Sequence, residues 1–229
     1  MMTKKISVLF AVIILTAGYA QAQFNFGLKA GFNLTNMSEK YDGEKPDKDD
    51  RGNFKPGFQI GLIGELSLSD AFAIQPGIVF ATQGTTYKGS WDDEYSKGEG
   101  KEKMNLNYIQ IPINAQYKMD LGGMKLLLQA GPYLGYGIGG KYKSEYTEDG
   151  ETEKGDGKIK FGKRDENSED YETAYIPNAF DFGIGLGAGL QFDNIQVVVG
   201  YNIGLANMTD VDKASMKNNG LAFTVAYLF

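Results

Sequence analysis

The chain has 229 residues, a formal net charge of -6, a pI near 4.8, no cysteine and no histidine. An acidic chain lacks the basic surface that binds phosphate backbones, so nucleic acid is excluded as a partner. Without histidine or cysteine the chain has no Ser-His-Asp triad, thiol nucleophile or histidine metal site, so we expect a non-enzyme with no cofactor and no metal site, with loose calcium binding to the outer loops as the alternative. Its 31 glycines, 14 tyrosines and 14 phenylalanines point away from a helical bundle.

Residues 1–22 have the three parts of a secretory signal peptide. A lysine pair forms the positive start, residues 6–17 are apolar, and Ala20-Gln21-Ala22 matches an A-x-A cleavage site. The apolar stretch is shorter than the roughly 20 residues that a membrane-spanning helix needs. We therefore predict export, cleavage of the leader, and one mature domain over residues 23–229.

Large apolar residues alternate with small or polar ones along the mature chain. In the last ten residues, from Gly220 to Phe229, the large side chains occupy every second position and Ala or Thr stands between them. A period of two is that of a β-strand with two different faces. The pattern predicts strands near 24–35, 58–68, 74–83, 109–118, 126–138, 180–192, 195–205 and 221–229.

Three prolines interrupt this pattern. Pro76, Pro112 and Pro132 fall inside predicted strands. Because proline cannot donate to a strand ladder, each predicts a bulge or a strand end.

Short and long connections alternate between the predicted strands. Tight turns are expected near 69–70, 120–123 and 193–194, whereas long charged segments fill 39–53, 84–103, 141–175 and 207–219. Short periplasmic turns and long outer loops are typical of outer-membrane barrels. The expected fold is therefore all-β, a closed antiparallel up-and-down transmembrane β-barrel of about eight strands, with outer-membrane lipid against its wall.

The polar face of each strand should then line the lumen. By alternation, five charged residues are candidates for the lumen wall: Lys29, Lys55, Glu65, Lys118 and Asp181. Because buried charges must be paired, we expect contacts between these lysines and carboxylates. A structural plug of hydrogen bonds is the simpler interpretation of this face, and a polar track for a small solute is the alternative.

Aromatic residues near the predicted strand ends are candidates for interfacial girdles. They are Phe24, Phe72, Tyr108, Tyr117, Tyr136, Phe192, Tyr201, Tyr227 and Phe229. The acidic segment from Glu145 to Asp156 also contains lysines, and its default interpretation is a solvated loop.

Three short motifs resemble the PorT-like outer-membrane β-barrel proteins. They are residues 23–33 after the Ala-Gln-Ala site, Tyr108-Ile109-Gln110-Ile111-Pro112, and Ala130-Gly131-Pro132-Tyr133. The chain is also similar to small barrels of the OmpX type, whose outer strands and loops bind other molecules. The resemblance implies an outer-membrane barrel assembled by the barrel-insertion machinery, with Tyr227 and Phe229 as the terminal assembly signal, and it supplies no catalytic residues.

These observations favour a non-enzymatic outer-membrane barrel with a structural or surface-binding role, in which the long outer loops contact an extracellular ligand or protein. The alternatives are a narrow solute channel of porin-like type and a component of a protein-secretion apparatus. A soluble periplasmic barrel with an apolar ligand inside would need its apolar and polar faces exchanged.

Overall fold

The computed structural model describes residues 24–47, 51–92, 97–164 and 172–229, so the predicted signal peptide lies outside the described residues. Within these ranges the regular elements are ten strands. They are β1 (Phe24–Tyr41), β2 (Lys55–Ser67), β3 (Phe72–Asp92), β4 (Lys97–Asp120), β5 (Lys125–Glu148), β6 (Glu151–Phe161), β7 (Thr173–Ile176), β8 (Phe180–Phe192), β9 (Ile195–Gly204) and β10 (Ala214–Leu228). None of the described residues belongs to a helix long and apolar enough to cross a membrane.

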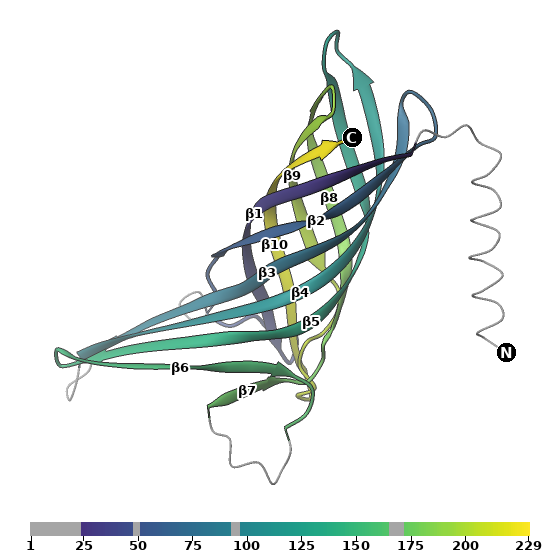
Figure 1. Cartoon of the computed structure of the whole chain (residues 1–229). Coiled ribbons are helices and arrows are strands. Elements are labelled where there is room, and N and C mark those ends of the chain that lie inside the picture. Colours follow the sequence, from purple (N-terminus) through teal and green to yellow (C-terminus); the bar gives the residue numbers. More distant parts are fainter. Residues whose placement is uncertain (1–23, 48–50, 93–96, 165–171) are drawn as a thin grey trace, which may run out of the picture.

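Eight of the ten strands form a ring (Figure 1). Neighbours in the sequence pair in antiparallel fashion from β1 to β5, β5 pairs with β8, and β8 continues through β9 and β10 back to β1. The remaining two, β6 and β7, are attached to one end of β5. The predicted all-β barrel of about eight strands is confirmed.

The large apolar side chains face outward from the ring. Six large apolar residues test this orientation, because packing together at the centre of the barrel would contradict a lipid-facing wall. They are instead 43 to 51% exposed. They are Phe182, Ile184, Leu186, Val197, Val199 and Phe223. Such a continuous apolar exterior would aggregate in water and matches the hydrocarbon of a bilayer.

Turn chemistry explains the tight connections at the end of the barrel where β1 starts. The Ser69 hydroxyl accepts from the Phe72 backbone N–H at 3.1 Å, and the Asp120 carboxylate accepts from the Gly122 N–H at 2.7 Å. The C-terminus lies at the same end, since Phe229 N donates to Phe26 O at 2.8 Å. This is the periplasmic end of an outer-membrane barrel, because short turns lie on that side.

The predicted proline interruptions lie inside strands rather than at their ends. The β3–β4 ladder lacks paired residues opposite Pro112, and the β4–β5 ladder lacks them opposite Pro132. The missing donor explains these gaps, and pairing resumes on both sides of each.

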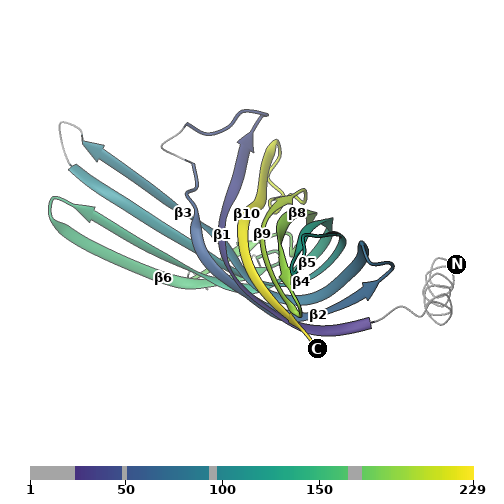
Figure 2. The ribbon, with the colours of Figure 1, turned by 90° about the horizontal axis from the view of Figure 1, so that it is seen from above.

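At the outer end, β3, β4, β5 and β6 continue beyond the barrel as a sheet that projects sideways (Figures 1 and 2). We call residues 82–92, 97–107, 139–148 and 151–161 the protruding sheet. The segments near 84–103 and 141–175, expected to be loops, are therefore largely strands. The short β7 runs parallel to the end of β6 and folds back toward the barrel mouth.

Candidate functional site

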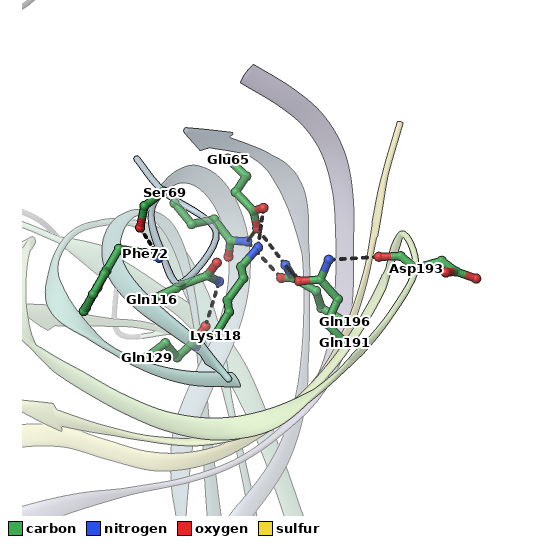
Figure 3. A network of polar contacts seen from close by, with 10 residues as sticks. Glu65, Ser69, Phe72, Gln116, Lys118, Gln129, Gln191, Asp193 and Gln196 are labelled. Carbon is green, nitrogen blue, oxygen red and sulfur yellow. Dashed lines mark hydrogen bonds and ion pairs between the residues drawn. The ribbon is translucent and has the colours of Figure 1, made fainter. Parts of the chain in front are cut away.

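A polar network fills the periplasmic half of the lumen (Figure 3). Glu65 on β2 forms an ion pair with Lys118 on β4, and both side chains are almost fully buried. Gln196 on β9 donates to Glu65 at 2.7 Å, and Gln75 on β3 donates to Gln196 at 2.9 Å. Strands from opposite sides of the ring are thus joined across the lumen, as the predicted plug requires.

Asp181 lies in a second polar cluster, nearer the outer mouth. Asn218 on β10 donates to its carboxylate at 3.2 Å and to the Tyr108 hydroxyl at 3.3 Å, and Tyr133 also contacts Asp181. The carboxylate is therefore held by neutral groups and not by the lysine that alternation led us to expect.

Lys29 stands apart from both clusters. It lines a cavity of about 50 Å³ in the middle of the barrel, together with amides from β2, β4, β5 and β9. Within the described chain it forms no ion pair or hydrogen bond through its side chain.

Lys55 lies outside both polar clusters. Its ammonium donates to Asn105 Oδ1 at 2.6 Å and to the Pro56 carbonyl at 3.2 Å, at the outer end of β2. Burial and the nearby Lys103 charge lower the pKa of Lys55, since both disfavour the protonated amine. The register of β2 with β1 continues to Lys55, which pairs with Thr35, whereas the pairing of β2 with β3 ends at Gln59.

An apolar cluster covers the outer mouth of the lumen, and we call it the lid. Its buried members come from β1, β4, β6, β7 and the loop before β10: Met37, Leu106, Tyr108, Ile159, Ile176 and Met208. Tyr108 is fully buried and stacks edge-on against Phe161 at 5.5 Å between ring centroids, so its assignment to the girdle is wrong. It faces inward, where the lid needs an apolar ring with a hydroxyl reaching Asn218.

The protruding sheet has two chemically distinct sides. Its register places every lysine of its four segments on one side, which we call the lysine face: Lys88, Lys97, Lys101, Lys103, Lys141, Lys143, Lys154, Lys158 and Lys160. This side continues the lipid-facing side of the barrel wall. Acidic residues are fewer there, and two form exposed ion pairs, Asp92 with Lys97 and Glu145 with Lys154.

The opposite side, which we call the aromatic face, carries the large rings of the protruding sheet. Trp91 packs over Gly98, Tyr146 over Gly100, and Tyr142 over Gly157. An aromatic ring over a cross-strand glycine replaces the packing that the glycine lacks. This face continues the lumen side of the wall and merges with the lid at Tyr142.

Two tyrosines on the aromatic face donate their hydroxyls to carboxylates. Tyr87 bonds to Glu39, and Tyr146 bonds to Glu102. Burial raises the pKa of Tyr87, and the hydrogen bond with Glu102 raises the pKa of Tyr146, because both favour the neutral phenol.

A bulge establishes this division of faces. The β4–β5 register shifts between Asn107 and Tyr108, opposite Gly137 and Gly139, which leaves Ile138 as the extra residue. One extra residue reverses the side on which all later side chains of β5 lie. Because of this shift, Lys141 and Lys143 continue the lipid-facing side and Tyr142 the lumen side.

The terminal aromatic pair is exposed on the barrel exterior. Tyr227 and Phe229 are 51% and 63% exposed, with ring centroids 6.2 Å apart. Both residues lie at the periplasmic end of the barrel.

The sequence analysis missed the cavity, the lid and the two faces of the protruding sheet. The sequence does contain a signal for the two faces. Three lysine pairs have a spacing of two, which places both members on the same side of a strand: Lys101 and Lys103, Lys141 and Lys143, and Lys158 and Lys160. The lid gave no comparable signal, since it joins residues far apart in the chain.

Comparison with known proteins identifies the family. A family model described as outer membrane protein beta-barrel domain matches residues 19–210. The search of curated proteins returned no match.

Solved barrels with similar folds have low sequence identity. The attachment invasion locus protein Ail of Yersinia pestis, in complex with the heparin analogue sucrose octasulfate, is 15% identical, with 90% of this chain and 99% of Ail covered and a TM-score of 0.36. Neisserial surface protein A is 13% identical, with 89% and 97% covered and a TM-score of 0.37. The N-terminal barrel of Pseudomonas aeruginosa OprF is 13% identical, with 91% and 100% covered and a TM-score of 0.32.

The family match covers most of the chain, and the ring of strands has an apolar exterior. The protein therefore belongs to the outer membrane protein beta-barrel domain family and lies in the outer membrane.

Proposed function

We propose that this protein is a non-enzymatic outer-membrane barrel whose protruding sheet binds an anionic partner through its lysine face. One observation carries the proposal. All nine lysines of the protruding sheet lie on one side, in a chain whose net charge is -6.

The arrangement of the lysine face lowers the stability of the protruding sheet. Lys88 pairs with Lys101, Lys103 with Lys143, and Lys141 with Lys158. Like charges directly opposite each other on adjacent strands are destabilising. A bound anionic group would offset this repulsion, which is why recognition explains the arrangement better than structure alone.

Phosphate-bearing lipid headgroups of the outer leaflet are the nearest anionic groups. The lysine face begins where the lipid-facing side of the wall ends, and Lys141 lies only three residues beyond Ile138. Lysine binds phosphate as a point charge, so the contact needs no fixed pocket and should weaken with salt.

The test compares a triple variant, Lys101→Gln, Lys103→Gln and Lys143→Gln, with the wild type. Binding of the detergent-solubilised barrel to phosphorylated and dephosphorylated lipid A vesicles should differ at least roughly tenfold for the wild type, and the difference should vanish in the triple variant. The control replaces Glu102, Glu148 and Glu153 of the aromatic face with Gln and should keep the preference. Equal binding by the wild type and the triple variant would contradict the proposal.

A narrow solute channel or a component of a secretion apparatus is the alternative. The polar network and the lid both count against conduction, since each lies across the lumen at a different depth.

We also propose that the protein is one of the PorT-like barrels, on the basis of residues 23–33, 108–112 and 130–133. The proposed assembly signal is the exposed pair Tyr227 and Phe229.

A further inference from the structure

The starting observation is a single unpaired cation inside the barrel. Lys29 is on the inward face of β1 and lines the 50 Å³ cavity. The Lys29 side chain is partly exposed, and the space that it faces is this internal cavity. Its neighbours along β1, Leu28 and Ala30, lie on the opposite side of the strand and form part of the lipid-facing surface. A charge removed from bulk water is stable only when an opposite charge and hydrogen bonds compensate for the lost solvation.

The buried carboxylates of the described chain are already engaged elsewhere. Glu65 is held by Lys118, Gln75 and Gln196, and Asp181 by Asn218 and Tyr133. Neither carboxylate lines the cavity. No carboxylate of the described chain therefore compensates the charge of Lys29.

Other polar groups in the same cavity lack partners as well. Gln110 is 6% exposed, and its Nε2 donor has no hydrogen-bond partner. The side chains of Asn114 and Asn202, from β4 and β9, form no hydrogen bond to another described residue. An ammonium, the free Nε2 donor of Gln110 and two further amide side chains thus line the same cavity.

The size of the cavity limits what can occupy it. One water needs about 10–15 Å³ of such space, so 50 Å³ holds roughly three or four water-sized particles. A monovalent ion of halide size with two or three waters fits, and a phosphate ester or a sugar does not. A single ammonium also balances one negative charge and not two.

We propose that the middle of the lumen is a binding site for a small monovalent anion, with chloride as the physiological occupant, held by the Lys29 ammonium and the Gln110 amide. This site is independent of the lysine face. It lies between the periplasmic network and the lid.

Bromide replaces chloride as a probe because it scatters X-rays anomalously. Crystals of the wild-type barrel grown in sodium bromide should show an anomalous peak within hydrogen-bond distance of Lys29 Nζ. Density for water alone in the cavity, with bromide only at the protein surface, would overturn the proposal.

Thermal unfolding gives a second measurement in solution. At constant ionic strength, replacing gluconate with chloride in the buffer should raise the Tm of the wild type by roughly 2–4 °C. Chloride fits the cavity, whereas gluconate is too large for it. The shift should be lost in Lys29→Met and kept in Lys45→Met, which removes an exposed lysine outside the lysine face. A shift of equal size in all three proteins would assign it to surface ions and contradict the site. If Lys29→Met does not fold, the bromide experiment on the wild type still decides.

Discussion

At the scale of single residues, the stability of the barrel depends on the ion pair between Glu65 and Lys118. Both groups are buried, so removing one leaves an uncompensated charge. We expect Glu65→Gln or Lys118→Met to lower the free energy of unfolding by about 3–5 kcal/mol, measured by urea titration of the folded barrel in vesicles.

Removing both partners should recover much of that loss, since the double variant buries no lone charge. Lys154→Met, which breaks the exposed pair with Glu145, is the matched control and should change stability little. Two single variants as stable as the wild type would show that the pair is not desolvated in the membrane.

Alternation along the strands assigns side chains to faces, and Lys29, Glu65, Lys118 and Asp181 lie on the inward faces of their strands. It could not assign their partners, since Glu65 and Gln196 are 131 positions apart and meet only through the ring. It misassigned Tyr108, because an inward aromatic residue at the mouth has the same sequence pattern as a girdle residue.

At the scale of elements, the protruding sheet depends on glycines that accept aromatic rings. A side chain at Gly98 would overlap the Trp91 ring and the Thr147 carbonyl, whereas a Cβ at Gly89 would meet no atom within 4 Å. We expect Gly98→Val to increase hydrogen exchange in the outer parts of β3, β4 and β5 by at least roughly tenfold and to leave the barrel strands protected.

Gly89→Ala on the same hairpin is the control and should leave exchange unchanged. If Gly98→Val exchanged like the wild type, the packing of Trp91 on this face would not be what holds the hairpins together.

The barrel strands could be predicted because lipid imposes apolar residues at every second position. The outer parts of β3 to β6 could not, since their alternation is between lysine and aromatic or acidic residues, which resembles a solvated loop. The bulge at Ile138 is also invisible in the sequence, although the position of every later residue on β5 depends on it.

At the scale of the whole molecule, two clusters of different chemistry lie at two depths of the lumen. The periplasmic network is polar and the lid is apolar. We expect the barrel to be silent in planar bilayers, and Glu65→Gln together with Lys118→Met to remain silent because the lid still covers the mouth. Stepwise ion conductance by the wild type would instead support the channel alternative.

The closed ring also predicts heat-modifiable migration. A barrel without free edges resists detergent until it is heated, so unboiled and boiled samples should migrate differently on a gel. Identical migration, with the protein absent from the membrane fraction, would contradict an integral barrel.

Trp91 is the single tryptophan of the chain and lies at the far end of the β3–β4 hairpin, beside Gly98. Its intrinsic fluorescence is therefore a built-in optical reporter for the hairpin tip, with no emission from tryptophan in the barrel to subtract. Docking of a partner, loosening of the outer strands and quencher access can each be followed in unlabelled protein.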